Sequence, residues 1–258
     1  MKKIESIGTP LKNWDVQINY GVKTGFNEAF IIDRKIKEEL LREDPKSGEI
    51  IRPILRGRDI KRYAYNFADC WLINVHNGIK ERDIKPININ DYPAVKKHLD
   101  NYVVELETRA DKGVSPYNLR NCAYMEDFSK QKIVWGNLNL KATYAFAEEG
   151  IYINAPCSMI VPANKYILAV LNSKLADYYI RNLGVTRNGG YFEYKPMFIE
   201  QLPIPMIDQS EQEKFASIVS EIIVHEKNLL NTKKYQEELD EMIFDLYQLS
   251  KEEKKILL

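Results

Sequence analysis

The sequence predicts an α+β fold, in which a mixed β-sheet domain is followed by a helical hairpin or small bundle at the C-terminal end. Through residue 209, short apolar or alternating runs are separated by turn residues, which is typical of strands and short helices. From residue 210 onward apolar residues recur at helical spacing, and no Pro or Gly occurs after Pro205. We therefore divide the chain into a mixed domain, residues 1–209, and a C-terminal helical region, residues 210–258.

Composition limits the class of protein. The 258 residues suffice for a sizeable core, and 37 Lys plus Arg balance 37 Asp plus Glu. A net charge of zero excludes a polycation but allows a local basic patch. Cys70, Cys122 and Cys157 are too widely spaced for a zinc site or a disulfide framework. Because no apolar run approaches the length of a membrane span, we expect a soluble cytoplasmic protein that contacts no membrane.

The first elements follow from short local patterns. Val16 to Tyr20 alternates apolar and polar residues and predicts a half-buried strand, and the apolar run Ala29 to Ile32 predicts a second one. We expect the two to form a strand–loop–strand unit with residues 21–25 at its tip. Lys35 to Glu43 is predicted to be a charged helix that ends near Asp44 and Pro45.

The middle of the chain alternates further strands and helices. Apolar residues at helical spacing predict helices at residues 93–109 and 166–181, and residues 202–205, Leu-Pro-Ile-Pro, are predicted to be a stiff, extended connector. Four buried or half-buried strands are predicted at Cys70 to Val75, Lys132 to Trp135, Thr143 to Phe146 and Ile151 to Ile153.

The C-terminal helical region begins with a capping box, Ser210 to Glu213, and a second capping box starts a last short helix at Ser250. Between them we expect a helical hairpin, or one long helix kinked near Asn231 and Thr232. This region holds 7 basic and 11 acidic residues, whereas residues 1–209 hold 30 and 26. The mixed domain is thus net positive and the helical region net negative. This is the difference in charge expected if the mixed domain faces phosphate and the helices face protein or solvent.

Motifs of common enzymes are missing. The sequence has no phosphate-binding P-loop, no dinucleotide fingerprint, no H-E-x-x-H and no G-x-S-x-G. Residues 23–25 and 129–132 match the K-T-G and S-x-x-K motifs of penicillin-binding enzymes, but in the wrong order and without S-D-N between them. We predict no catalytic residue and no metal ligand in this chain.

The densest charged feature is the basic segment, residues 52–62, with five basic residues and one acid. Arg presents a planar fork that fits a phosphate or the O6/N7 edge of guanine, and Lys supplies a point charge. Gly57 places part of the segment on a turn. The alternative is a solvated face with structural ion pairs, such as Arg58 with Asp59. The candidate nucleic-acid contacts here are Arg56, Arg58, Lys61 and Arg62.

A second candidate is the glycine-rich stretch Gly184 to Phe192. Arg187 and Asn188 carry the side chains best suited to guanine and adenine edges, and Tyr191 has a ring that can stack. Gly189 and Gly190 free the backbone for left-handed geometry. The alternative is a plain hairpin turn followed by a buried aromatic residue.

Two weaker features complete the candidates. Lys23 and Thr24 place a cation and a hydroxyl at what we expect to be an exposed loop tip beside Gly25. Asn137 and Asn139 offer amides to a groove, although core or turn roles are the preferred interpretation.

Long, ordered motifs resemble a known family. Residues 18–33, Ile-Asn-Tyr-Gly-Val-Lys-Thr-Gly-Phe-Asn-Glu-Ala-Phe-Ile-Ile-Asp, and residues 54–63, Ile-Leu-Arg-Gly-Arg-Asp-Ile-Lys-Arg-Tyr, closely resemble the C-terminal specificity region of TaqI-like and type IIG restriction–modification enzymes. Residues 171–175, 202–205 and 245–253 are similar to its later landmarks, so the resemblance covers almost the whole chain. The plan is also similar to that of a target-recognition domain of type I specificity subunits.

The resemblance implies sequence-specific recognition of double-stranded DNA. In that family a separate domain methylates adenine N6, with an Asn-Pro-Pro-Tyr signature, and a nuclease domain often precedes it; neither is in this sequence. The chain is therefore expected to be a non-catalytic specificity module of a larger enzyme, or a standalone specificity subunit. It would need no cofactor itself, and S-adenosylmethionine and Mg²⁺ would serve the catalytic domains, joined in cis or in trans.

The resemblance also sorts the candidate residues. Phosphate and groove contacts are expected from the basic segment and its neighbouring loop, and base contacts from the glycine-rich stretch. The DNA-binding residues predicted in this way are Lys23, Thr24, Arg56, Arg58, Lys61, Arg62, Arg187, Asn188 and Tyr191. The C-terminal helices would dock onto the catalytic domain or another subunit. The alternatives are a protein-interaction module or type I-like subunit acting through those helices, and an enzyme of unrecognised type.

Overall fold

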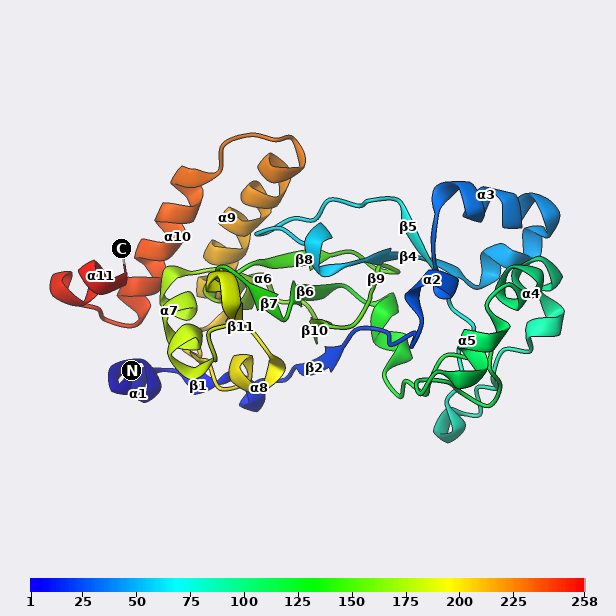
Figure 1. Cartoon of the computed structure of the whole chain (residues 1–258). Coiled ribbons are helices and arrows are strands. Elements are labelled where there is room, and N and C mark those ends of the chain that lie inside the picture. Colours follow the sequence, from blue (N-terminus) through cyan, green and yellow to red (C-terminus); the bar gives the residue numbers. More distant parts are fainter. Residues whose placement is uncertain (258) are drawn as a thin grey trace.

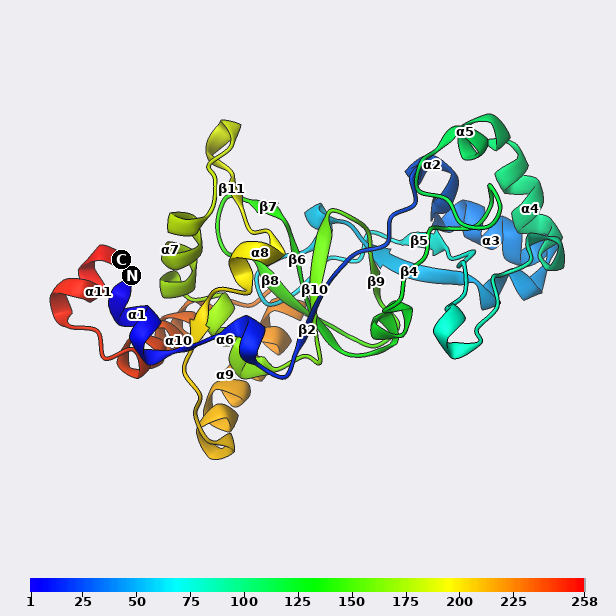
Figure 2. The ribbon, with the colours of Figure 1, turned by 90° about the horizontal axis from the view of Figure 1, so that it is seen from below.

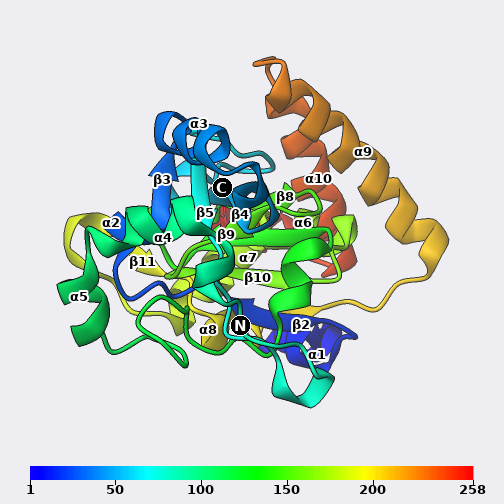
Figure 3. The same cartoon turned by 90° about the vertical axis from the view of Figure 1, so that its right-hand side faces the viewer.

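A central four-stranded sheet lies between two helical ends in the computed structural model, which describes residues 1–257 (Figure 1). Both chain termini lie at the same end, where Lys3 Nζ donates a 2.7 Å hydrogen bond to Glu253 (Figure 1). Figure 3 views the molecule from the opposite end, which carries α3, α4 and α5. The predicted α+β class is confirmed.

The central sheet has the strand order β2-β10-β6-β8 and is antiparallel throughout. Successive side chains of a strand point to opposite faces. Ile133 and Ile160 therefore enter the core under α6, while Val134 and Met159 enter the core shared with the second sheet. Both faces of the sheet are covered, which explains why β6 and β10 are buried along their whole length. The strands are β2 (Gln17–Tyr20), β6 (Lys132–Gly136), β8 (Tyr144–Ala147) and β10 (Cys157–Val161).

A second sheet has the order β3-β5-β4-β9, in which only the β4–β9 pair is parallel. Two further strand pairs, β1 with β12 and β7 with β11, fix segments that are distant in sequence. The second sheet comprises β3 (Ile31–Asp33), β4 (Ile51–Leu55), β5 (Cys70–Ile73) and β9 (Tyr152–Ile153). The small pairs comprise β1 (Thr9–Pro10), β7 (Leu138–Asn139), β11 (Phe192–Glu193) and β12 (Pro203–Ile204).

The helices gather at the two ends of the molecule (Figures 1 and 2). One end holds α2 (Asn27–Phe30), α3 (Arg34–Glu43), α4 (Pro93–Asp100) and α5 (Val103–Thr108). The other holds α1 (Lys2–Ile7), α6 (Lys165–Leu171), α7 (Lys174–Leu183), α8 (Pro196–Ile199), α9 (Gln209–Lys227), α10 (Lys233–Leu246) and α11 (Lys251–Leu257).

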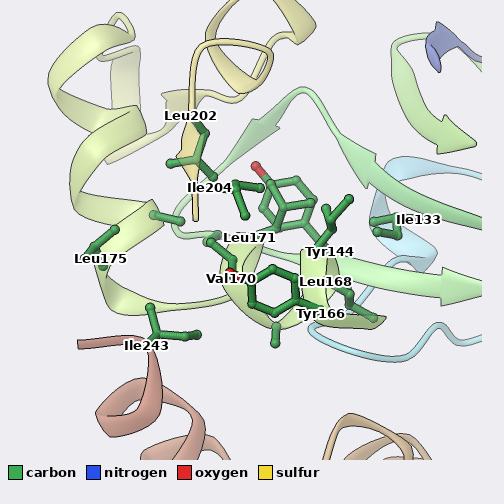
Figure 4. Close-up of a cluster of buried hydrophobic side chains, with 14 of the residues drawn as sticks. Ile133, Tyr144, Tyr166, Leu168, Val170, Leu171, Leu175, Leu202, Ile204 and Ile243 are labelled. Atoms are coloured by element: carbon green, nitrogen blue, oxygen red, sulfur yellow. The ribbon is translucent and has the colours of Figure 1, made fainter. Parts of the chain in front are cut away.

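The C-terminal helices share a core with the mixed domain. The ring of Phe215 in α9 lies 5.1 Å from that of Tyr166 in α6, and Ile243 in α10 is fully buried in the same cluster as Leu171 and Leu175 (Figure 4). Truncating a fully buried Ile to Ala costs about 2–5 kcal/mol, so these helices contribute to the stability of the whole chain. Residue 209 marks the start of a helix within one core, and a separate docking role for residues 210–258 stays a prediction.

The predicted strand–loop–strand unit is wrong. β2 pairs with β10 in the central sheet, whereas β3 pairs with β5 in the second sheet, so the intervening loop crosses between sheets. Residues 27–30 form α2, which buries Ala29 and Phe30. The alternation of residues 16–20 predicts a strand correctly, but it contains no information about the strand's partner. The connector at residues 202–205 is also more than a spacer, because Pro203 and Ile204 pair with β1.

Two predicted helices are each divided in two. The span 93–109 breaks into α4 and α5 at Asn101 and Tyr102. The span 166–181 breaks at Asn172 and Ser173, where Ser173 Oγ accepts a 3.1 Å hydrogen bond from the backbone N of Ala176 and so caps α7. A Ser before a helix is a start signal, and here it overrides a continuous apolar stripe.

The C-terminal helices are a hairpin followed by a short helix, and the expected break near residues 231–232 is confirmed. Ser250 and Glu253 form the predicted reciprocal capping box. The first capping box is wrong, because Asp208 caps α9 by accepting a 2.9 Å hydrogen bond from Glu211 N, and Ser210 lies inside the helix.

Candidate DNA interface

Five loop segments from distant parts of the chain join into one strip, here called the loop strip: residues 21–25, 55–59, 136–139, 154–157 and 185–193. Backbone hydrogen bonds link neighbouring segments, including Gly21 N to Cys157 O at 2.8 Å and Asn154 N to Leu55 O at 3.1 Å. Tyr194 N donates to Asn137 O at 2.9 Å. In Figure 2 the hairpin before β11 projects at one end of this strip, and α2 lies beyond the other.

Close backbone approach explains why glycine occurs at position 21 of the strip. A Cβ atom on Gly21 would lie 2.5 Å from the carbonyl carbon of Asn154, so no other residue fits without a shift. Gly57 packs against Gly136, with the position of its missing Cβ 3.9 Å from Gly136 Cα. The basic segment is thereby brought next to the loop that carries Asn137 and Asn139.

Three of the five cations in the basic segment are used by the fold. Arg52 donates to the carbonyl groups of residues 48, 49 and 51. Arg56 binds buried Asp59 through Nε at 2.9 Å and Nη2 at 3.0 Å. Arg62 donates to Asn172 O at 2.5 Å, in the turn between α6 and α7. The structural ion pair anticipated for this segment therefore exists, but it involves Arg56 instead of Arg58.

The side chains of Arg58 and Lys61 remain exposed. Lys61 Nζ donates to Arg58 O at 3.0 Å, which ties the two residues into one short turn beside η3 (Gly57–Asp59). Within residues 1–257, neither side chain forms an ion pair with a carboxylate. Of the four candidates in the basic segment, these two are available to a ligand without breaking an ion pair, and Lys61 keeps two ammonium hydrogens besides the one donated to Arg58 O.

The Lys23 loop differs from the expected exposed tip. Thr24 is only 3% exposed, and its hydroxyl donates to Asn27 Oδ1 at 2.7 Å, at the start of α2. The prediction that Thr24 lies at an exposed tip is therefore wrong, because its hydroxyl points inward and connects the loop to α2. Lys23 is exposed and lines an open hollow together with Tyr20, Arg120 and Asn121.

A buried arginine holds this loop in place. Arg109 is 6% exposed and donates to four backbone carbonyls, those of Thr24, Asp111, Pro116 and Asn118. Burial lowers the pKa of Arg109 to about 10, so the guanidinium is still charged at neutral pH. Sequence reasoning placed Arg109 at the end of a helix and missed both it and Arg120. Most of their partners lie within nine residues, but they belong to an irregular loop that has no recognisable pattern.

The glycine-rich stretch forms a hairpin. Phe192 pairs with Asn139 and Glu193 with Leu138, and Arg187 N donates to Tyr191 O at 2.7 Å. Gly189 and Gly190 both have φ +78, a left-handed conformation that glycine adopts without strain. Exposed apolar side chains also line this hairpin, including Leu138, Leu140, Val185 and Tyr191.

The three predicted contact residues of the hairpin, Arg187, Asn188 and Tyr191, are all exposed. The aromatic residue that follows, Phe192, is half-buried under the guanidinium of Arg181 at 4.4 Å. The geometry therefore combines the two interpretations considered for this stretch: a hairpin turn that also presents polar side chains to solvent.

A rigid base supports the hairpin. Asp177 Oδ1 accepts hydrogen bonds from Ala142 N at 2.6 Å and from the hydroxyl of Tyr194, and Asp177 Oδ2 pairs with Arg181 at 3.0 Å. Asn139 donates to Gly136 O at 2.6 Å within its own turn. The hydroxyl of Ser158 donates to Asn137 Oδ1 at 2.9 Å. The preferred turn role is therefore confirmed for Asn139, whereas Asn137 is only half-buried and is tied to β10 through Ser158.

Among residues 1–257, no group of three or more His, Cys, Asp or Glu side chains is arranged to hold a metal ion. Within the same residues, no helix has both the length and the apolar character needed to cross a membrane.

An α+β domain that presents cations, amides and an aromatic ring from several loops on one strip is typical of a nucleic-acid specificity domain. The family model of the TaqI-like C-terminal specificity domain matches residues 52–204, which is more than half of the chain. The chain belongs to this family of specificity domains of restriction–modification enzymes.

Curated relatives include two type II methyltransferases. The chain is 24% identical over 239 residues to M.MjaIV of Methanocaldococcus jannaschii, covering 88% of this chain and 77% of the relative. It is 21% identical over 247 residues to M.BstVI of Geobacillus stearothermophilus, covering 93% of this chain and 40% of the relative.

Two solved structures share the fold. The type IIL restriction–modification enzyme MmeI, solved in complex with DNA, superposes with a TM-score of 0.74 at 13% identity, over 94% of this chain and 34% of MmeI. The type IIG restriction endonuclease BpuSI gives a TM-score of 0.56 at 16% identity, over 95% of this chain and 31% of BpuSI. The chain spans about a third of each enzyme.

Proposed function

We propose that the chain recognises a specific sequence in double-stranded DNA and positions it for a catalytic domain of a restriction–modification enzyme. The observation that carries this proposal is the loop strip itself. Exposed Lys23, Arg58 and Arg187 come from segments far apart in sequence, yet backbone hydrogen bonds connect those segments into one strip.

Different parts of the strip would take different roles. Lys23, Arg58 and Lys61 would contact phosphates, because exposed cations without a carboxylate partner bind a polyanion at little cost. Arg187 and Asn188 would contact base edges, and Tyr191 would stack or wedge at the groove. Thr24, Arg56 and Arg62 would act indirectly, by shaping the loops that present the others.

The catalytic steps would be carried out by other domains. Methyl transfer to adenine N6, or cleavage, would be carried out by a methyltransferase or nuclease domain joined in cis or in trans, and S-adenosylmethionine and Mg²⁺ would bind there. The last turn of α9 and the turn between α9 and α10 form a candidate docking point, because Val224, Leu229 and Leu230 expose their apolar side chains there.

Duplex binding as a function of salt tests the proposal. We expect Arg58→Gln to reduce the slope of log Kd against log salt by about 0.9, the value for one released phosphate contact. Lys234→Gln, which removes an exposed cation from α10, is the matched control and should leave the slope unchanged. The proposal would be wrong if no duplex of any sequence bound at low salt, with the chain alone and with a methyltransferase domain added.

A further inference from the structure

A buried carboxylate lies at the foot of the hairpin and holds two exposed cations. Glu193 is 5% exposed, and the strand pair β7–β11 fixes its backbone. Its Oε1 atom accepts hydrogen bonds from Arg187 Nε at 2.6 Å and from Arg187 Nη2, and its Oε2 atom pairs with Lys195 Nζ at 2.9 Å. Both carboxylate oxygens are therefore occupied by cations that themselves remain about half exposed.

The geometry leaves one edge of Arg187 free. A guanidinium carries five N–H donors in a fixed plane. The Nε–Nη2 side faces Glu193, so Nη1 and the second hydrogen of Nη2 still point along the outer edge of the plane. That edge offers two parallel donors, which is the arrangement that guanine O6 and N7 accept.

Charge balance favours a ligand that is itself negative. The group formed by Glu193, Arg187 and Lys195 has a net charge of +1, because two cations share one carboxylate. Hydrogen bonds from Lys195 and Arg187 lower the pKa of Glu193, so its carboxyl group stays ionised at neutral pH. The anchor thus restricts the rotamers of Arg187 before a duplex arrives, without cancelling the positive charge of the hairpin.

We propose that Glu193 is a positioning residue for DNA recognition, which holds the guanidinium of Arg187 edge-on for a guanine in the target sequence. This inference rests on the proposed function, because it assumes that the hairpin faces DNA. It adds a residue that contacts no base, and it assigns guanine to Arg187.

The test compares two duplexes and four variants of the full chain. One duplex is selected by the wild-type chain from a randomised pool, and the other is a scrambled duplex of the same composition. We expect Glu193→Gln to reduce the ratio of the two Kd values by about tenfold, within the range for one bidentate base contact, and to leave binding of the scrambled duplex equal or slightly tighter. Glu200→Gln, at the end of α8, is the matched acidic control and should leave the ratio unchanged.

A double-mutant cycle separates positioning from general support. If Glu193 acts through Arg187, the double variant of Glu193→Gln and Arg187→Gln loses no more of the ratio than Arg187→Gln alone. A partly unfolded variant weakens both Kd values by the same factor, so the ratio does not depend on stability.

The outcomes distinguish the two levels of the proposal. An unchanged ratio for Glu193→Gln, or losses that add in the double variant, overturns the positioning role while the proposed function stands. The guanine–cytosine pairs of the selected duplex are also replaced one at a time. At one position the replacement should abolish the effect of Arg187→Gln on the ratio. If no position behaves in this way, Arg187 does not contact guanine. A wild-type chain that binds no duplex contradicts the proposed function itself.

Discussion

The basic segment at residues 52–62 and the hairpin at residues 185–193 both present arginines on the loop strip, but the fold uses them in opposite ways. In the basic segment, Arg56 binds Asp59, and Arg62 donates a hydrogen bond to the carbonyl of Asn172. In the hairpin, Arg187 is held by Glu193 while its outer edge stays exposed. The basic segment, which has the higher charge density in the sequence, is therefore mainly a structural turn. The hairpin has fewer charges but presents more side chains to a ligand.

The largest expected effect concerns stability of the basic segment. Asp59→Ala removes the acceptor of three hydrogen bonds from Arg56, including that of its backbone N at 2.8 Å. We expect a loss of about 2 kcal/mol in the free energy of unfolding, since Arg56 is partly exposed and part of the pair is screened. Urea denaturation measures it. Arg58→Gln is the control, expected within about 0.5 kcal/mol of wild type, and equal losses in the two variants would break the comparison.

The next effect concerns sequence preference of the hairpin. Asn188→Ala removes an exposed amide at the tip and should lower the preference for the selected duplex by about 1–2 kcal/mol, in the lower part of the range of about 1–3 kcal/mol for one base contact. The free energy of unfolding should not change, because Asn188 is exposed. Competition binding and urea denaturation of the same preparation measure the two quantities. A variant with lower stability and intact preference would show that the hairpin is only a structural turn.

How much of this was predictable depends on where each partner lies. The pairing of Arg56 with Asp59 spans three residues and leaves a local signal, although the sequence alone suggested Arg58 as the partner. The partner of Arg62 is Asn172, 110 positions away, so no window of sequence contains it. The same holds for strands: β2 was predicted from its alternation, but its pairing with β10 is set by the tertiary fold.

The candidate site was also only partly predictable. The exposed hairpin tip was predictable because adjacent glycines favour left-handed turns, and both adopt φ +78. The supporting residues Arg109 and Glu193 were not singled out, although most of their partners lie close in sequence, because contacts within irregular loops follow no regular spacing. The family could be recognised from long, ordered motifs. Such motifs indicate the fold, but they do not show which side chains remain exposed to a ligand.

A smaller effect concerns the far end of the strip. Lys23→Gln should weaken selected and scrambled duplexes equally, and should reduce the salt slope by about 0.9, because a phosphate contact carries no sequence information. Fluorescence anisotropy at several salt concentrations measures both. Loss of preference without a change in slope would instead make Lys23 a base contact and erase its difference from the hairpin.

The smallest expected effect is in acid. Lys195 and Arg187 lower the pKa of Glu193, and a group whose pKa is lowered in the folded state loses its contribution only as the pH falls through that lowered value. The ratio of Kd values for selected and scrambled duplexes should therefore be the same at pH 7.5 and at about pH 5.5, above the ordinary pKa of a glutamate. If the ratio decreases when the pH is lowered from 7.5 to about 5.5, a group other than Glu193 holds Arg187.

The most direct test of the central claim is photo-crosslinking of the strip to DNA. With p-benzoylphenylalanine in place of Tyr191, at the hairpin, we expect light-dependent crosslinks to the selected duplex that unlabelled duplex competes away. The same replacement of Leu230, an exposed residue at the turn between α9 and α10, should give none. Crosslinks from residue 230 but not from residue 191 would contradict the account, because DNA would then lie on the helical end instead of the loop strip.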